Sequence, residues 1–194
     1  DYQDRKPERT GSTEFIILQV GILEPRKGQD MVLDACEKLW SEGMDFKLVL
    51  LGRVNPHYGK TILDKVRRLQ ADRQNLLHLD CASDSELEKW HKSATLQISP
   101  SLAEGFGLPV LEACWAGCPV LASRQPVFEI LPEWKGLKCL ERVTTEQIYS
   151  ELKTILLEPG HLDTAVNHSL TQRLPKWSDT ADALIRTFYP DRKS

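Results

Sequence analysis

The sequence predicts an α/β protein with a doubly wound, Rossmann-like parallel sheet, and three observations support this prediction. Short apolar runs alternate with longer amphipathic segments about five times, which is the order of parallel strands and their connecting helices. The apolar runs at 15–20 and 46–51 are continuous rather than alternating, as in strands that are buried on both faces. Right-handed crossovers then distribute the helices over both faces of one sheet.

Strands and helices are expected to alternate along the chain. The strands are expected near residues 14–20, 46–52, 76–80, 95–99, 119–122 and 136–140. The helices are expected near residues 28–43, 59–73, 83–93, 107–117, 144–158, 160–173 and 177–188. The helix predictions depend on apolar residues that recur at steps of three and four, such as Val32, Cys36 and Leu39. The helix at 107–117 also has Pro109 in its first turn, where proline is favoured.

Length and composition exclude several classes of protein. The chain has 194 residues, with 25 Lys and Arg against 28 Asp and Glu, and this formal charge of −3 argues against a nucleic-acid-binding protein. Its apolar runs are far shorter than the roughly 20 residues of a transmembrane helix. The charged start, Asp1 to Lys6, lacks the apolar stretch of a signal peptide. It reads as an internal start, and residues 1–13 are expected to be a linker or a disordered end.

Neither the cysteines nor the histidines form a reactive or metal-binding pattern. The cysteines, at positions 36, 81, 114, 118 and 139, are odd in number, contain no Cys-x-x-Cys and mostly lie in apolar segments. Buried free thiols in a reducing cytosol are therefore expected. The histidines are scattered without a His-x-x-His pattern, so no metal site is expected.

The loop after the first strand is one candidate site, because a doubly wound sheet binds ligands outside the carboxyl ends of its strands. Gly21 permits a tight turn there, and Arg26 and Lys27 precede Gly28 at the start of the next helix. Two adjacent cations beside a helix N-terminus suit a phosphate or a diphosphate. A solvated loop without a ligand is the alternative, and the spacing is not the dinucleotide fingerprint G-x-G-x-x-G.

The loop after the fourth strand is the second candidate, with the sequence SPSLAEGFGLPVLE at 99–112. The N–H groups of Gly105 to Leu108 are expected to face an anion, assisted by the dipole of the next helix. Glu104 and Glu112 are expected to accept hydrogen bonds from sugar hydroxyls at two ends of one ligand, because carboxylates repel phosphates. A glycine turn followed by an ordinary helical glutamate is the alternative.

These segments resemble the donor-binding half of the retaining GT-B glycosyltransferases of family 4. The matching segments, in chain order, are VGILEPRKG at 20–28, SDSEL at 83–87, EGFGLPVLEA at 104–113 and GCPV at 117–120. The resemblance covers about residues 14–188, and it identifies residues 14–194 as a nucleotide-sugar-binding domain with a C-terminal helix. By this resemblance, the family's N-terminal acceptor domain is expected to lie outside this chain.

The resemblance implies a role for each matching residue. Glu104 holds hydroxyls of the donor sugar, Glu112 holds the ribose hydroxyls, and the cations neutralise the diphosphate as it leaves. The expected catalytic residues are Glu104, Arg26 and Lys27. The backbone N–H groups that face the sugar and the diphosphate are those of Gly105, Phe106, Gly107 and Leu108. The remaining expected donor-binding residues are Gly21 at the tight turn, Glu112, and Cys81, Ala82 and Arg53 near the base.

The sequence departs from the family pattern at two places. Many members have an arginine directly after the glycine of the first loop, whereas this chain has Ile22, so the diphosphate depends on Arg26 and Lys27. The usual glycine-rich loop after the second strand is replaced by RVNPHY at 53–58, which predicts an unusual base pocket. The Glu-Pro-Arg-Lys variant resembles mannosyl- and rhamnosyltransferase-like members and favours GDP-mannose as the donor.

The resemblance therefore implies a hexosyltransferase that uses a nucleotide-diphosphate sugar, needs no metal and acts on a glycan or lipid-linked acceptor. It also implies a cytoplasmic enzyme of polysaccharide biosynthesis, with any contact to the inner face of the membrane made through the missing half. The isolated domain is expected to be inactive, because transfer needs both substrates aligned in one cleft. A catalytically degenerate nucleotide-sugar-binding module and a GT-B-like epimerase or phosphorylase are the alternatives.

Overall fold

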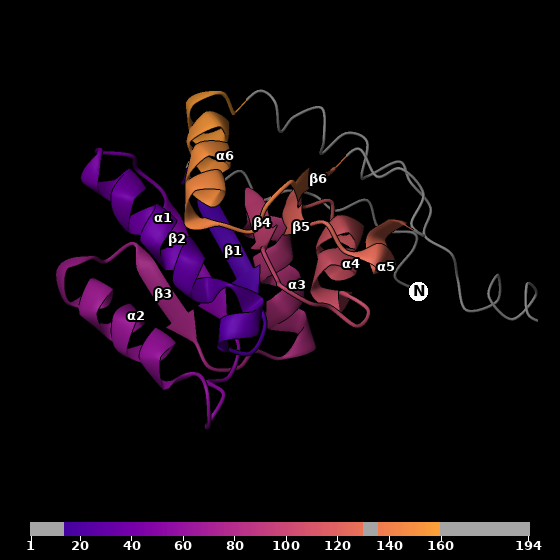
Figure 1. Ribbon diagram of the computed structural model, residues 1–194, viewed down its shortest axis with the longest axis horizontal. Helices are drawn as coiled ribbons and strands as arrows, with labels where there is room; N and C mark the ends of the chain where they lie inside the picture. Colours follow the sequence, from indigo (N-terminus) through magenta and orange to yellow (C-terminus); the bar gives the residue numbers. More distant parts are fainter. Residues whose placement is uncertain (1–13, 130–135, 160–194) are drawn as a thin grey trace, which may run out of the picture.

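The computed structural model describes residues 14–129 and 136–159, in which one parallel sheet lies between two layers of helices (Figure 1). Its strands are β1 (Ile16–Val20), β2 (Lys47–Leu51), β3 (Leu76–Leu79), β4 (Leu96–Ser99), β5 (Val120–Ser123) and β6 (Leu137–Leu140). Their order across the sheet is β3-β2-β1-β4-β5-β6, and every neighbouring pair is parallel. The predicted α/β class and doubly wound sheet are confirmed.

The described helices are α1 (Gln29–Ser41), α2 (Lys60–Asp72), α3 (Asp84–Ser93), α4 (Leu108–Trp115), α5 (Pro126–Glu129) and α6 (Thr145–Leu157), with a 3-10 turn at Pro25–Lys27. Helices α1, α2 and α6 cover one face of the sheet, and α3 and α4 cover the other (Figure 1). The sequence does not predict the 3-10 turn or α5, because a single turn is too short to repeat an apolar stripe. None of the described helices combines the length and the apolar character needed to span a bilayer.

Three of the expected segments cannot be compared with the structure. The helices expected near 160–173 and 177–188 and the linker expected at 1–13 lie outside the described residues.

The central strands β1, β2, β4 and β5 are buried on both faces, as the apolar runs of the first two predict. Successive side chains on a strand point to opposite faces. On β1, Ile17 accordingly packs in the core under α1, α2 and α6, whereas Leu18 packs in the core under α3 and α4. Both side chains are fully buried. This sandwich fixes the sheet, and with it the strand ends from which the candidate loops project.

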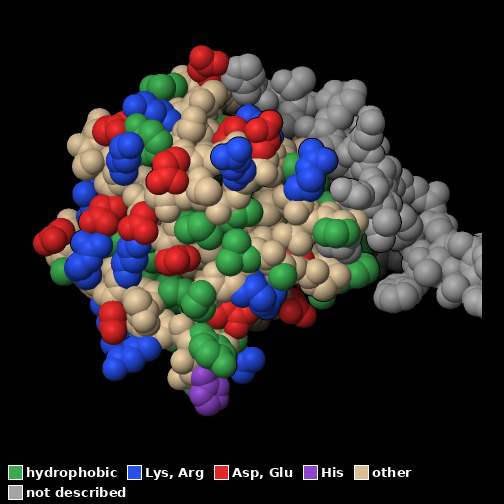
Figure 2. All heavy atoms as spheres, in the orientation of Figure 1, with side chains coloured by type: hydrophobic (Ala, Val, Ile, Leu, Met, Phe, Trp, Pro, Cys, Tyr) green, Lys and Arg blue, Asp and Glu red, His purple; other side chains and the backbone are tan. Residues whose placement is uncertain are grey.

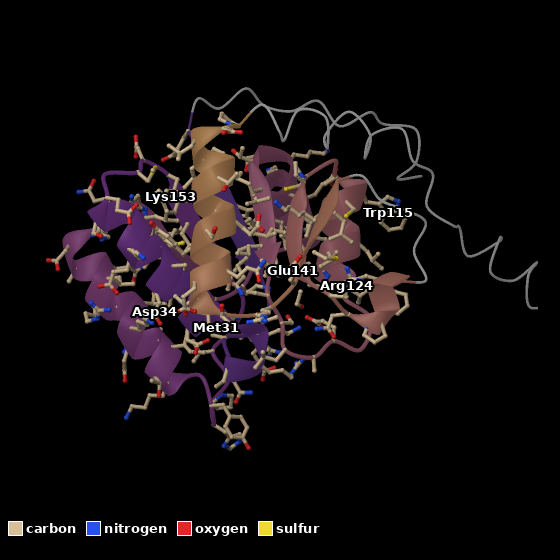
Figure 3. All side chains as sticks on the ribbon, turned by 45° about the horizontal axis from the view of Figure 1, so that its top comes forward. Met31, Asp34, Trp115, Arg124, Glu141 and Lys153 are labelled. Carbon is tan, nitrogen blue, oxygen red and sulfur yellow. The ribbon has the colours of Figure 1, made fainter. Side chains whose placement is uncertain are left out.

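Charged side chains of both signs are interspersed on the outer face of α1, α2 and α6 (Figure 2). Lys65 on α2 pairs with Asp34 on α1, and Lys153 on α6 pairs at 2.7 Å with Glu42, which follows α1. Asp34 and Lys153 are labelled in Figure 3. Exposed ion pairs stabilise a fold only slightly. The apolar cores therefore supply most of the packing energy between these layers.

The cysteines follow the expectation of buried free thiols only in part. All are free of disulfide bonds, and Cys36, Cys114 and Cys118 are buried, but Cys139 is half-buried and Cys81 is exposed. Burial raises the pKa of the Cys36 and Cys114 thiols, so both stay protonated near neutral pH. Cys81 differs because β3 has ended before it and the chain has entered a surface loop.

Candidate functional site

Both loops singled out in the sequence meet where the strand order reverses, between β1 and β4. The chain leaves β1 toward α1 on one face and leaves β4 toward α4 on the other, and a crevice forms at such a point. The two loops are in direct contact, because the Leu102 N–H donates to the Arg26 carbonyl at 2.8 Å. The sheet topology therefore brings the two candidate loops into one site.

Gly21 makes a tight turn at the end of β1, as the sequence predicts. Its φ is 149°, and its N–H donates to the Leu51 carbonyl at 2.9 Å. The backbone also approaches Gly52 closely, because a Cβ at that position would lie 2.1 Å from the Gly21 carbonyl oxygen. The ends of β1 and β2 thus come closer together than a side chain would permit.

The two cations that follow lie on a 3-10 turn whose end is closed by Gly28. Gly28 has a φ of 71°, and a Cβ there would lie 2.6 Å from the Pro100 carbonyl oxygen. The turn therefore packs against the start of the loop that joins β4 to α4, residues 100–107, which we call the β4 loop. Gln19 on β1 supports the turn from below, with its Nε2 donating to the Lys27 carbonyl at 2.9 Å. The backbone of Lys27 is therefore fixed by the hydrogen bond from Gln19 and by the packing of Gly28 against Pro100.

Lys27 and Glu104 form an ion pair that joins the two loops. The Lys27 Nζ lies 2.7 Å from the Glu104 Oε1, and the two side chains are only 13% and 8% exposed. A charge-assisted hydrogen bond of this length is strong, and the low exposure limits its screening by water. The sequence identified both residues, but only the fold shows that they form a pair.

Arg26 has a different environment from Lys27. Its Nη2 lies 2.7 Å from the Glu24 Oε1, and its Nη1 donates to the Ala103 carbonyl at 2.6 Å. The side chain is 47% exposed, so its guanidinium also faces solvent at the edge of the crevice. Arg26 thus combines a contact to the β4 loop with a positive charge available to an anion.

The two glycines of the β4 loop have different structural roles. Gly107 precedes α4 with a φ of 71°, and a Cβ there would lie 2.5 Å from the Phe128 Cε1, so only glycine fits without strain. A Cβ at Gly105 would meet no atom within 4 Å. The backbone N–H groups of Gly105, Phe106 and Gly107 donate to no acceptor among the described residues. These groups can therefore bind a ligand at the start of α4.

Glu112 lies on the second turn of α4 and is half-buried. Burial, and to a smaller extent the Asp84 carboxylate, raises the pKa of the Glu112 carboxyl group. Asp84 begins α3, directly after the loop that contains Cys81 and Ala82. Glu112 therefore lies within electrostatic range of the loop in which the base is expected.

The loop after β2 packs against the loop after β1, which the sequence does not predict. The Leu23 N–H donates to the Arg53 carbonyl at 2.8 Å, and the Asn55 N–H donates to the Leu23 carbonyl at 3.0 Å. The Asn55 Nδ2 also donates to the Glu24 Oε2 at 2.8 Å. The Asn55-Pro56 pair signals a turn, but no local pattern pairs this asparagine with a glutamate so distant in the chain.

The remaining expected site residues line the same edge of the sheet. Cys81 and Arg53 are exposed, Ala82 is half-buried, and Phe106 and Leu108 expose more than half of their side chains. Residues 14–129 and 136–159 contain no group of three or more His, Cys, Asp or Glu side chains that could hold a metal ion. The site as described consists of cations, carboxylates and backbone N–H groups.

Comparison with known proteins finds one matching family and several relatives with named activities. A family model described as glycosyl transferases group 1 matches residues 2–162. The chain is 35% identical over 112 residues to the serotype-specific mannosyltransferase WbdA of Escherichia coli, a match that covers 58% of this chain and 14% of WbdA. It is 33% identical over 116 residues to the D-inositol 3-phosphate glycosyltransferase of Acidothermus cellulolyticus, which covers 56% of this chain and 26% of that protein. The matches thus span well under half of these relatives.

Solved structures share the fold at lower identity. The C-terminal domain of a glycosyl transferase group 1 family protein, LpcC from Francisella tularensis, superposes with a TM-score of 0.69 at 21% identity, covering 90% of this chain and 86% of that one. The Anabaena protein HepE, solved in complex with UDP and glucose, superposes with a TM-score of 0.74 at 18% identity, covering 91% and 48%. The fold is therefore that of a GT-B C-terminal domain.

Proposed function

The chain belongs to the glycosyl transferases group 1 family, and from this premise we propose that it is the donor-binding domain of a retaining hexosyltransferase. The complete enzyme transfers a hexose from a nucleotide-diphosphate sugar to a glycan or a lipid-linked acceptor. The observation that carries this proposal is the Lys27–Glu104 pair at the switch point of the sheet, with the backbone N–H groups of 105–107 beside it. Cations for phosphates and carboxylates for hydroxyls are what a nucleotide sugar requires.

Transfer of the sugar leaves negative charge on the diphosphate. Lys27, Arg26 and the N-terminus of α4 stabilise this charge as the bond to the anomeric carbon breaks. Glu104 accepts hydrogen bonds from hydroxyls of the sugar, and the contact from Lys27 orients its carboxylate for that purpose. Glu112 accepts hydrogen bonds from the ribose hydroxyls, and the base lies against the loops that contain Arg53, Cys81 and Ala82.

The donor and the acceptor are proposed on narrower grounds. The name of WbdA as a mannosyltransferase and the Glu-Pro-Arg-Lys sequence favour GDP-mannose. We assign the acceptor to a separate N-terminal domain of the complete enzyme, so residues 1–194 by themselves bind the donor without turnover. Measurable sugar transfer by residues 1–194 alone would contradict this assignment of donor and acceptor to two different domains.

Calorimetric titration with GDP, UDP, dTDP and their sugar conjugates tests the proposal. One nucleotide should bind preferentially, and Glu112→Ala should weaken its binding at least about tenfold, because a carboxylate that accepts hydrogen bonds is lost. Asp45→Ala is the control, since it removes an exposed carboxylate at the opposite edge of the sheet. Failure of every nucleotide to bind, or equal effects of the two variants, would contradict a donor site at this edge.

A catalytically degenerate nucleotide-sugar-binding module is the second candidate, and Ile22 favours it. An arginine at this position would add a positive charge to the diphosphate site, and Ile22 supplies none. A complete enzyme that binds the donor but neither transfers nor hydrolyses it would support this candidate. Epimerisation of the donor sugar without transfer would instead identify a GT-B-like epimerase.

A further inference from the structure

The Arg26 side chain is held in place by two contacts, one from its own loop and one from the loop after β4. Its Nη2 lies 2.7 Å from the Glu24 Oε1, and its Nη1 donates to the Ala103 carbonyl at 2.6 Å. A half-exposed arginine usually samples many rotamers, whereas two convergent contacts select one of them. The backbone of Arg26 also accepts from the Leu102 N–H at 2.8 Å, so this residue contacts the β4 loop through both its backbone and its side chain.

Glu24, which orients Arg26, is itself oriented by Asn55. The Glu24 Oε2 accepts from the Asn55 Nδ2 at 2.8 Å, and the Glu24 side chain is only 14% exposed. The Asn55 Oδ1 in turn accepts from the N–H groups of His57 and Tyr58 at 3.0 and 3.2 Å, which fixes the amide within its own turn. An unbroken chain of hydrogen bonds thus runs from the loop after β2 to the loop after β4.

We propose that Asn55 and Glu24 are positioning residues of the donor site, which act through Arg26 to hold the β4 loop beside Lys27. We call this chain of hydrogen bonds, from Asn55 through Glu24 and Arg26 to the Ala103 carbonyl, the relay. Within it, the Asn55 Oδ1 accepts from its own turn and the Asn55 Nδ2 donates to Glu24. One carboxylate oxygen of Glu24 accepts from Asn55 and the other accepts from Arg26. Arg26 in turn donates to the carbonyl of Ala103, the residue directly before Glu104. Nucleotide affinity should therefore depend on Asn55, an uncharged residue in a different loop. This consequence rests on the proposed function, whereas the relay itself does not.

Asn55→Asp tests the relay with a nearly isosteric change. The introduced carboxylate can still accept from the His57 and Tyr58 N–H groups, but it presents an acceptor and a like charge to Glu24 in place of a donor. Adding Glu24→Gln to this variant reverses the pairing, because the glutamine amide can donate to the new carboxylate and still accept from Arg26. The double variant has the same net charge as the unaltered protein.

The expected result is a loss in the single variant and recovery in the double variant. Asn55→Asp should weaken binding of GDP or UDP, whichever the protein binds better, about tenfold, and the double variant should return to within about threefold. Without any ligand, hydrogen exchange at the Leu102 amide should accelerate about tenfold in Asn55→Asp and slow again in the double variant. Asn75→Asp is the matched control, because the Asn75 Nδ2 donates to the Phe46 carbonyl at the opposite edge. It should change neither readout.

Each outcome decides the proposal. Unchanged exchange and affinity in Asn55→Asp, or a loss that the double variant does not repair, would show that the pairing with Glu24 does not position the loop. An equal effect of Asn75→Asp would reduce the result to general destabilisation. If no nucleotide binds to the unaltered protein, the proposed function fails, and the exchange measurement still decides whether the relay holds the loop.

Discussion

Replacement of Lys27 by methionine tests how strongly the two loops of the site are joined. At an effective dielectric constant of about 20, unit charges 2.7 Å apart attract each other by roughly 6 kcal/mol, most of which offsets the desolvation of both groups. Lys27→Met removes the attraction but leaves the Glu104 carboxylate at 8% exposure. The free energy of unfolding should therefore fall by about 3 kcal/mol, slightly less than for a fully buried pair.

Urea denaturation of four proteins measures this effect: the unaltered protein, Lys27→Met, Glu104→Gln and the double variant. The two losses should not add, and the cycle should give a coupling energy of about 2 kcal/mol. Lys92→Met is the control, because its pair with Glu88 on α3 is 30% and 35% exposed and should be worth under about 1 kcal/mol. Equal losses for Lys27→Met and Lys92→Met would refute the argument from burial.

Three further predictions concern stability and pH. Gly107→Ala should lower the free energy of unfolding by about 2–3 kcal/mol, because the φ is 71° and the Cβ would meet Phe128, whereas Gly105→Ala, which has open space, should cost under about 1 kcal/mol; equal losses in urea would contradict this reading. Burial and a neighbouring carboxylate raise the pKa of Glu112, so its ionised form is destabilising at neutral pH and the cost vanishes as the pH falls toward about 4. Glu112→Gln should therefore be more stable than the unaltered protein at pH 7 but not near pH 4, and lower stability at pH 7 would contradict this. Burial lowers the pKa of His91 to about 4, so its contribution is complete above about pH 6.5, and roughly 3 kcal/mol is lost as the pH falls to 4. His91→Gln should flatten this part of the stability profile, and an unchanged profile would show that His91 is not its cause.

Much of the fold could be predicted because its signals are local. The β1 and β2 runs are apolar except for Gln19 and Lys47, since both faces of a central parallel strand are buried. The start of α3 agrees with the expectation because Ser83 and Glu86 form a capping box within one turn. The 3-10 turn at Pro25–Lys27 and α5 could not be predicted, because a single helical turn is too short for apolar residues to recur at helical spacing.

The candidate site could be predicted as a set of residues but not as an arrangement. Glu104, Lys27 and Gly107 stand out because charge next to glycine at a strand end is visible in the sequence. The reason that position 107 must be glycine is not visible, because Phe128 reaches it from α5. Asn55 likewise resembles an ordinary turn residue until the fold places its amide on Glu24.

The sequence by itself therefore determined the α/β class, the position of each described strand and the two loops that carry the charged and glycine residues. Only the tertiary structure decided that Lys27 pairs with Glu104, that Arg26 contacts the β4 loop and that Asn55 orients Glu24. The physical reason is one of range. Helical periodicity, capping and turn preferences act over a few residues, whereas contacts between distant loops depend on which strands become neighbours in the sheet.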